Sequence, residues 1–178
     1  NSPEVFKWVT SLSPDYVILF GSGIIKDPLL SYYKNKMINM HLGLSPYYRG
    51  GGTNFWPLVN GEPECVGVTI HLATADVDGG PILSQERPDV EIGDGPHDIG
   101  CKTIIAGTDL MIKCIREYKR GRITPTPQKP GGKLYKRKDF NADAVRKMLK
   151  NFESGMIEEY LKNKAERDRN YPIIQKCA

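Results

Sequence analysis

Residues 15–23 read DYVILFGSG, and residues 37–41 read MINMH. The first stretch is an unbroken apolar run, Tyr16–Phe20, that a Gly-Ser-Gly turn ends. Such a run predicts a strand buried on both faces, as in a parallel sheet. Pro28 suits the first position of a short helix between this strand and a second strand at 37–41. The order strand, helix, strand predicts an α/β fold.

The flanking sequence extends this pattern in both directions. The other expected elements are a helix at 3–11, a loop at 45–52, a short helix from Thr53, a strand at 65–72 with a hairpin partner at 81–86, and a helix at 98–119. On that long helix, five apolar residues recur at helical spacing: Ile104, Ile105, Met111, Ile112 and Ile115. Together the elements predict a Rossmann-like mixed sheet followed by C-terminal helices.

The C-terminal part carries the signature of an amphipathic helix. Asn141 is the expected N-cap, and the apolar stripe that follows consists of Val145, Met148, Leu149, Phe152 and Met156. Between the two helical regions, residues 119–130 form a basic, proline-rich connector. We therefore divide the chain into an α/β core at 1–130 and a helical extension at 131–178.

The composition limits the classes of protein to which the chain can belong. A length of 178 residues suits one domain, and a hydrophobic content of 39% supports a core. No apolar run approaches the roughly 20 residues that cross a bilayer. The cysteines Cys65, Cys101, Cys114 and Cys177 form no CxxC pair, which argues against a disulfide scaffold and a zinc knuckle. Free thiols fit a reducing compartment, so a cytoplasmic location without a membrane partner is expected.

Two polar side chains share one face of the strand at 37–41. Alternate residues of a strand point the same way, so Asn39 and His41 lie together while Ile38 and Met40 face the other side. Ligands of open α/β sheets bind where a strand ends and a loop begins. The alternative is a structural pair, in which Asn39 caps a turn and His41 is a satisfied buried histidine.

Several separated motifs decide between these alternatives. They are Asn39-x-His41, Pro46-x-x-Arg49-Gly50, the run Gly67-Val68-Thr69-Ile70-His71, and Asp78-Gly79. In this order they resemble the catalytic segment of the folate-dependent formyltransferases, and the resemblance covers most of residues 14–90. Where that family has serine two positions after the histidine, this chain has Gly43, and Ser45 stands where leucine is usual.

The resemblance implies a catalytic trio of Asn39, His41 and Asp78. The chemistry agrees, because a neutral amine attacking a formyl carbon generates a tetrahedral intermediate with a developing oxyanion. Asn39 could donate an amide hydrogen to that oxygen. His41 could stabilise the oxyanion if protonated, or carry the proton from the amine to the leaving group. Asp78 is expected to favour the imidazolium form of His41.

The resemblance also implies the cosubstrate 10-formyltetrahydrofolate and no metal. Its pterin ring is expected between the loop after the first strand and the loop carrying Asp78. The cofactor-binding residues are then Phe20, Gly21, Ser22, Gly23, Ile24, Ile25, Asp76 and Gly79. For Asp76, a solvated turn is an equal alternative.

The acceptor is expected to bind the loop at 47–50, which contains Tyr47, Tyr48, Arg49 and Gly50. Arg49 could pair with a phosphate, whereas packing of the tyrosines on Trp56 is the alternative for those two. His71 is expected to be structural or at the edge of the site. The family also implies further strands before Tyr16, so the catalytic core as given would lack its N-terminal part.

The acceptor predicted from the resemblance is the primary amine of a nucleotide-linked amino sugar. Residues 54–56, Asn-Phe-Trp, resemble the amino-sugar enzymes, and residues 141–178 are expected to form helix and tail, not the barrel-like domain of a methionyl-tRNA formyltransferase. Glycinamide ribonucleotide transfer and formyl-folate hydrolysis are the alternatives, and a homodimer is left open. From other classes, a metal-dependent hydrolase could use His41, His71, Asp76 and Asp78. A nucleic-acid-binding module could use the basic residues of 119–138, but we predict no nucleic-acid partner.

Overall fold

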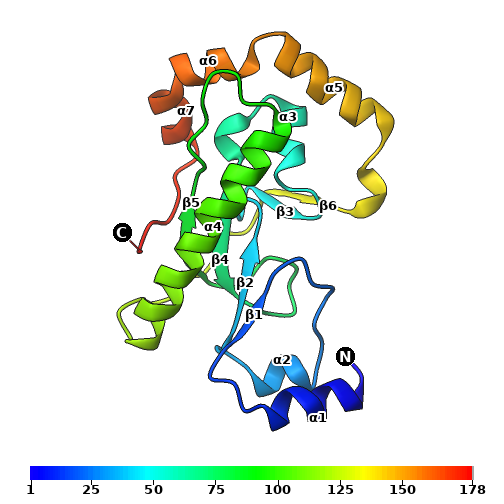
Figure 1. The fold of residues 1–178 in the computed structure, drawn as a ribbon, viewed down its shortest axis with the longest axis vertical. Coiled ribbons are helices and arrows are strands. Elements are labelled where there is room, and N and C mark those ends of the chain that lie inside the picture. Colours follow the sequence, from blue (N-terminus) through cyan, green and yellow to red (C-terminus); the bar gives the residue numbers. More distant parts are fainter. Residues whose placement is uncertain (178) are drawn as a thin grey trace.

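A mixed four-stranded sheet lies at the centre of the molecule, in a computed structural model that describes residues 1–177 (Figure 1). Its strands run in the order β1 (Val17–Leu19), β2 (Met37–His41), β4 (Val68–Leu72) and β5 (Ile82–Glu86). β1 is parallel to β2, and the other two pairings are antiparallel. The predicted mixed sheet and its β4–β5 hairpin are confirmed. β4 begins three residues later than the expected start at residue 65, because Cys65 is the last residue of the short helix η1 (Pro63–Cys65).

The prediction that the first strand is buried on both faces is wrong. β1 lies at the edge of the sheet and pairs only with β2. Ile18 on this strand is 43% exposed, and Phe20 just after it is 50% exposed. The apolar run does predict a strand, but the burial of a strand depends on its neighbours in space, which the run does not encode.

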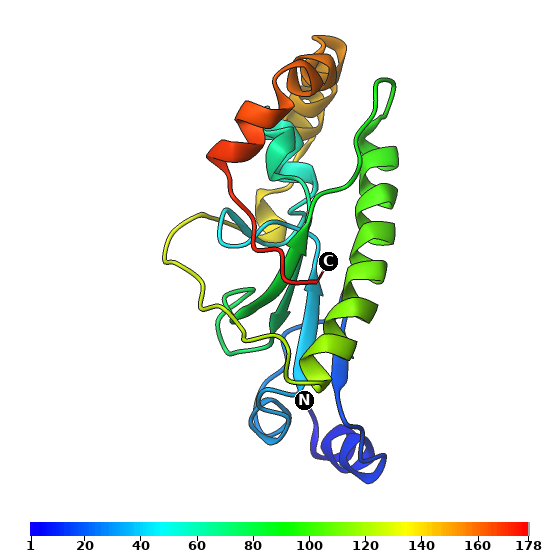
Figure 2. The ribbon, with the colours of Figure 1, turned by 90° about the vertical axis from the view of Figure 1, so that its left-hand side faces the viewer.

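The long helix α4 (Pro96–Lys119) covers one face of the sheet (Figure 2). It begins two positions before the expected start, because Asp98 accepts a hydrogen bond from the Gly95 backbone N–H at 2.9 Å. The predicted apolar stripe is only partly right, since Met111 is buried whereas Ile104, Ile105 and Ile112 are 38%, 64% and 46% exposed. The buried face carries Ile99, Thr103, Gly107, Leu110, Met111 and Cys114.

Two glycines of α4 provide a matched test of this packing. A Cβ on Gly107 would lie 2.9 Å from Val68 Cγ2 and 3.0 Å from Met40 Sδ, whereas one on Gly100 would meet nothing within 4 Å. We expect Gly107→Ala to lower the free energy of unfolding by about 1–2 kcal/mol, because it overpacks the helix–sheet contact. Gly100→Ala should raise it by about 0.5–1 kcal/mol through helix propensity. Urea unfolding of both variants checks the opposite signs, and equal signs would contradict this packing.

A second core lies at one end of the sheet, where four helices meet (Figure 1). They are α3 (Phe55–Asn60), α5 (Ala142–Glu153), α6 (Met156–Lys162) and α7 (Lys164–Asn170). The predicted N-cap is confirmed, since Asn141 Oδ1 accepts a hydrogen bond from the Ala144 N–H at 2.9 Å. Gly155, at φ +78°, separates α5 from α6. The helices α1 (Pro3–Ser11) and α2 (Leu29–Tyr32) lie at the opposite end.

A two-stranded parallel ribbon was not predicted. β3 (Tyr48–Gly50) pairs with β6 (Lys133–Tyr135), and the helix η2 (Arg137–Asp139) follows. Each strand has only three residues, and their pairing depends on contacts between segments far apart in sequence, so no local pattern reveals it. The ribbon brings the start of the C-terminal extension beside the loop that follows β2. The boundary at residue 130 stays a prediction.

The end of the described chain runs beside β5. The Gln85 N–H donates to Ile174 O at 2.6 Å, and the Lys176 N–H donates to Ser84 Oγ at 3.0 Å. Cys177 Sγ lies 2.9 Å from Cys114 Sγ on α4, and both cysteines are free thiols. Among residues 1–177, no helix is both long and apolar enough to span a bilayer.

Candidate active site

Strand register brings three of the polar residues together. Asn39 and His41 lie on the same face of β2, and His71 of β4 stands directly opposite Asn39 in the antiparallel pairing. Asp78 comes from the loop between β4 and β5 and has φ +48°. A left-handed conformation is uncommon for aspartate and costs backbone strain, so the surrounding contacts must hold this loop in place.

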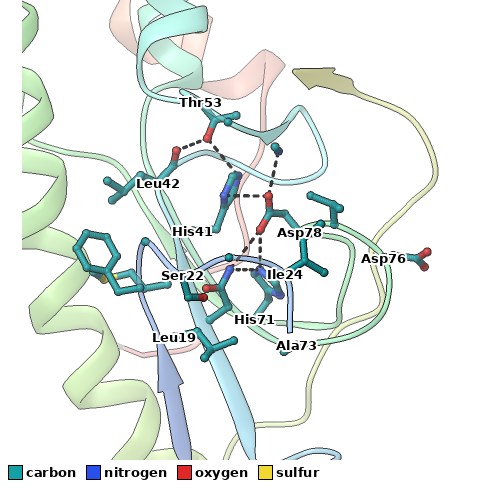
Figure 3. Close-up of a pocket in the computed structure, with 18 of the residues that line it drawn as sticks. Leu19, Ser22, Ile24, His41, Leu42, Thr53, His71, Ala73, Asp76 and Asp78 are labelled. Atoms are coloured by element: carbon teal, nitrogen blue, oxygen red, sulfur yellow. Dashed lines mark hydrogen bonds and ion pairs between the residues drawn. The ribbon is translucent and has the colours of Figure 1, made fainter. Parts of the chain in front are cut away.

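Asp78 is the hub of the cluster (Figure 3). Its Oδ1 accepts a hydrogen bond from Asn39 Nδ2 at 3.2 Å, and its Oδ2 accepts one from the Gly50 N–H at 2.9 Å. Oδ2 also lies 3.3 Å from His41 Nδ1. The predicted convergence of Asn39, His41 and Asp78 is therefore observed. Their catalytic roles stay a prediction.

His41 is buried, with only 6% of its surface exposed, and its two ring nitrogens face different partners. Nε2 lies 3.0 Å from Tyr48 O, and because a carbonyl only accepts, Nε2 carries the hydrogen. Burial lowers the pKa of His41 below its ordinary value and outweighs the opposing effect of Asp78. Asp78 favours the imidazolium form of His41, as expected, but desolvation disfavours it more strongly, so the pKa of His41 is not raised overall.

The contact between His41 Nδ1 and Asp78 Oδ2 is then a site for one proton. Hydrogen bonds from Asn39 Nδ2 to Asp78 Oδ1 and from the Gly50 N–H to Asp78 Oδ2 favour the ionised form of this carboxyl group. A proton arriving between the two atoms is thus taken by Nδ1. The adjacent carboxylate stabilises the imidazolium that results.

The lowered pKa of His41 predicts a dependence of stability on pH. The unfolded chain binds this proton below about pH 6.5 while the folded chain resists it, so the free energy of unfolding falls as the pH drops through that value. The slope due to His41 is at most about 1.4 kcal/mol per pH unit. Chemical unfolding at pH values from 7.5 down to 5, in steps of about half a pH unit, measures this slope.

Two variants isolate this contribution. His41→Phe should lose the slope, whereas His97→Gln, which changes an exposed histidine, should keep it. The lowered pKa of Asp78 acts in the same direction but only below its ordinary value of 3.8, outside the measured window. A wild-type curve that is flat, or that rises, as the pH is lowered would contradict a neutral buried His41.

His71 lies inside the cluster, although the sequence favoured a structural or peripheral place for it. Its side chain is buried, and its Nδ1 lies 2.9 Å from Leu72 O. Its Nε2 lies 3.1 Å from Asn39 Nδ2 and 3.6 Å from Asp78 Oδ1, the latter too long for a hydrogen bond. The pairing of β2 with β4 could have revealed this position, because residues on the same face of adjacent strands are neighbours.

Thr53 fills the space that the glycine at position 43 leaves. A Cβ on Gly43 would lie 2.6 Å from His41 Nε2 and 2.7 Å from Thr53 Cβ. Thr53 Oγ1 donates to Leu42 O and lies 3.5 Å from His41 Nε2. A serine at position 43 would therefore collide with Thr53. The hydroxyl group beside His41 comes from Thr53 instead.

A cavity of about 870 Å³ opens onto the cluster. Its lining includes Asn39, His41, His71 and Asp78, together with the loop Phe20–Ile25 and residues 73–78. Ser22, Ile24 and Ala73 lie on one side of His41, and Thr53 lies on the other (Figure 3). Of the predicted cofactor-binding residues, all line the cavity except Gly79. Asp76 points away from Asp78 (Figure 3).

The other side of the cavity is lined by residues 50–55 and by Leu134, Tyr135 and Lys136. Of the predicted acceptor-binding residues, only Gly50 is among those lining it. Tyr48 is 1% exposed and stacks on Tyr135, and the Tyr47 hydroxyl donates to Pro172 O at 2.8 Å. Arg49 lies beside Gly79. The two tyrosines therefore pack in the core cluster that contains Trp56, but their aromatic partners are Tyr135 and Tyr171 and not Trp56 itself.

Two residues that were not predicted as site residues, Gln128 and Ser45, support the Asp78 loop. Gln128 Nε2, from the connector, donates to Asp78 O and to Gly80 O, both at 2.7 Å. Ser45 Oγ donates to Asp78 O at 3.2 Å. These bonds hold the backbone that carries the Asp78 carboxylate. Nothing in the local sequence marks Gln128 for this role.

The structure also bears on the two alternatives from other classes, a metal-dependent hydrolase and a nucleic-acid-binding module. In the part of the chain that the structure describes, no group of three His, Cys, Asp or Glu side chains is placed to hold a metal ion. In the basic stretch 119–138, Lys119 pairs with Asp15 at 2.8 Å and Lys133 pairs with Glu62 at 2.9 Å. Acidic partners thus neutralise part of that stretch.

Comparison with known proteins agrees with this site. The model of the family described as formyl transferase matches residues 1–115. The chain belongs to the formyl transferase family. The methionyl-tRNA formyltransferase of Thermodesulfovibrio yellowstonii is 35% identical over 68% of the chain and 40% of its own length. The enzyme of the same name from Finegoldia magna is 32% identical over 67% of the chain and 39% of its own length.

Solved structures extend the likeness to enzymes with other acceptors. The formyltransferase PseJ of Anoxybacillus kamchatkensis, in complex with UDP-4,6-dideoxy-4-formamido-L-AltNAc and tetrahydrofolate, has a TM-score of 0.64 at 27% identity over 70% of this chain and 66% of its own. The Helicobacter canadensis N-formyltransferase, in complex with folinic acid and dTDP-3-aminofucose, has a TM-score of 0.62 at 25% identity over 74% of this chain and 52% of its own. The chain thus spans about two fifths of the curated relatives named above.

Proposed function

We propose that this protein transfers the formyl group of 10-formyltetrahydrofolate to the primary amine of a nucleotide-linked amino sugar. The observation that carries the proposal is the order of features along one cavity. Ser22 and Ala73, from the loops 20–25 and 73–78, lie on one side of His41 and Asp78, and Thr53, from residues 50–55, lies on the other (Figure 3). A donor and an acceptor bound on opposite sides would meet at the trio.

The cofactor side fits a flat heterocycle. A Cβ on either Gly21 or Gly23 would meet nothing within 4 Å, so the cavity at this loop stays open to a ring that approaches the backbone. When bound, the folate supplies the formyl carbon as an activated amide. The chain's own groups then orient the amine, take its proton and keep the Asp78 carboxylate in place.

Proton transfer follows from the resting state of His41. The amine lone pair forms a bond to the formyl carbon, the carbonyl π electrons move to oxygen, and the amine proton passes to His41 Nδ1. Asp78 Oδ2, 3.3 Å away, stabilises the imidazolium. The electrons on the oxygen then re-form the carbonyl bond, the bond to the folate nitrogen breaks, and that nitrogen takes the bonding pair and the proton from His41. The neutral imidazole is thereby restored.

The solved relatives support an amino sugar as acceptor, since two of them contain nucleotide-linked sugars. The second candidate is methionyl-tRNA, because the two curated relatives named above are methionyl-tRNA formyltransferases at 35% and 32% identity. Both candidate acceptors carry phosphate groups, which a lysine side chain can bind. Lys136 lines the acceptor side and lies at the end of the ribbon, where either a nucleotide phosphate or a tRNA phosphate could reach it.

An acceptor panel tests the proposal on the full chain. The panel contains dTDP-3-aminofucose, a UDP-linked amino sugar, glycinamide ribonucleotide and methionyl-tRNA, each with 10-formyltetrahydrofolate. We expect turnover with a nucleotide-linked sugar and release of tetrahydrofolate in equal amount. If methionyl-tRNA is the one acceptor of the panel that is formylated, the acceptor is methionyl-tRNA and not an amino sugar. Formate release without any acceptor would indicate a hydrolase and overturn transfer.

A further inference from the structure

The orientation of the Asn39 amide is fixed by its neighbours. Asp78 Oδ1 lies 3.2 Å from one end of this amide, and His71 Nε2 lies 3.1 Å from the same end. An ionised carboxylate only accepts hydrogen bonds, so the amide atom that faces it must be the nitrogen. The opposite orientation would place the amide oxygen against the carboxylate oxygen and cost a hydrogen bond.

The tautomer of His71 is fixed in the same way. Nδ1 lies 2.9 Å from the carbonyl oxygen of Leu72, which only accepts, so Nδ1 carries the hydrogen. In the neutral ring, Nε2 then has a free lone pair and accepts the second amide hydrogen of Asn39. Both hydrogens of Nδ2 are therefore used within the protein, one by Asp78 and one by His71.

The remaining polar atom of Asn39 is its carbonyl oxygen. Oδ1 has no hydrogen-bond partner among residues 1–177. It is also not one of the fully buried side-chain atoms without a partner, so it is partly exposed. Because Asn39 lines the cavity, this oxygen is the atom that a bound ligand can reach. A carbonyl oxygen accepts, so it suits the N–H of an amine and repels an oxyanion.

We propose that His71 is a positioning residue which, together with Asp78, holds the Asn39 amide so that Oδ1 accepts an N–H bond of the attacking amine. This inference rests on the proposed function and changes the role expected for Asn39, from oxyanion donor to amine acceptor. One N–H of the primary amine binds Oδ1, the other proton passes to His41 Nδ1, and the lone pair then points at the formyl carbon.

The arrangement selects a primary amine. A neutral primary amine has two N–H bonds, one for each of the two acceptors, whereas a secondary amine has only one. An N-methylated acceptor should therefore react poorly even where its methyl group fits. If Asn39 loses its orientation, the rate of transfer to the primary amine should fall, and the preference for the primary over the N-methylated amine should fall with it. A purely structural role for His71 does not predict this loss of preference.

Two substitutions separate positioning from packing. In His71→Gln the side-chain oxygen can replace Nε2 as the acceptor for Asn39 Nδ2, whereas His71→Leu offers similar bulk without an acceptor. With dTDP-3-aminofucose as the probe, we expect His71→Leu to lose about 10- to 100-fold in kcat/KM, the effect of one misplaced hydrogen bond. His71→Gln should recover most of that loss. Calorimetry should show folate affinity changed less than about 3-fold in both.

The inference can fail separately from the proposed function. Nitrogen NMR of the wild-type imidazole, without any acceptor, should show His71 protonated at Nδ1 and not at Nε2. The opposite tautomer or an imidazolium overturns the inference whatever the enzyme's activity. If the wild type transfers formyl but His71→Leu has the same kcat/KM as the wild type, the inference is also overturned. The same holds if the kcat/KM of His71→Gln is as low as that of His71→Leu. Absence of transfer to the whole panel overturns the proposed function instead.

Discussion

His41→Ala and Asp78→Ala are each expected to lower kcat on the order of 100-fold or more, with folate affinity changed far less. His41→Ala removes the atom that takes the amine proton. Asp78→Ala removes the carboxylate that stabilises the imidazolium and leaves the Gly50 N–H and one Asn39 hydrogen without their partner. Both groups act on charge that develops only during the reaction, so the loss falls on turnover. Steady-state kinetics with calorimetry of folate binding measures the two effects.

Controls make this result specific. His97→Ala changes an exposed histidine and should leave turnover unchanged. Asp78→Asn keeps the shape but removes a charge that raises the pKa of His41, so the acid limb of its kcat profile should move to lower pH. A His41→Ala enzyme with near-normal turnover beside an inactive His71→Leu enzyme would show that the proton acceptor is the other histidine.

Gly50→Ala is expected to have the largest effect on stability. Gly50 has φ +92°, and a Cβ there would lie 2.1 Å from Tyr135 O on the neighbouring strand. Left-handed strain and the clash together should lower the free energy of unfolding by about 3–5 kcal/mol. The clash separates β3 from β6 and displaces the N–H that binds Asp78 Oδ2, so turnover should fall with stability.

Gly61→Ala is the matched control for this change. Gly61 has φ +73°, but a Cβ there would meet nothing within 4 Å. It should cost only the backbone strain, about 1–2 kcal/mol, and leave turnover unchanged. Urea unfolding compares the two variants. A Gly50→Ala protein as stable as Gly61→Ala would show that the β3–β6 ribbon does not form as described.

Local sequence patterns were sufficient for the elements that carry the trio. The alternation in residues 37–41 placed Asn39 and His41 on one face, and the resemblance to formyltransferases identified Asp78 across a gap of more than thirty residues. The N-cap Asn141 and the β4–β5 hairpin are also local signals, and both are confirmed. Each depends on neighbours within a few positions, which is the range in which periodicity and capping act.

The features that were missed depend on contacts between distant segments. His71 became part of the site because β4 pairs with β2, and Gln128 because the connector returns to the Asp78 loop. The lowered pKa of His41 results from burial of its side chain, and a sequence motif does not predict how deeply a side chain is buried. The apolar face of α4 was partly misassigned because isoleucines occur on both sides of that helix, and only the position of the sheet decides which side is covered.

The most direct test of the central claim follows an isotope-labelled formyl carbon from 10-formyltetrahydrofolate. Incubated with the full chain and dTDP-3-aminofucose, the label should appear in a new amide of the sugar, with an equal amount of tetrahydrofolate. The Asp78→Ala protein should bind the folate but transfer the label on the order of 100-fold more slowly. Label recovered only as formate, or equal transfer by wild type and Asp78→Ala, would contradict formyl transfer at the Asn39–His41–Asp78 cluster.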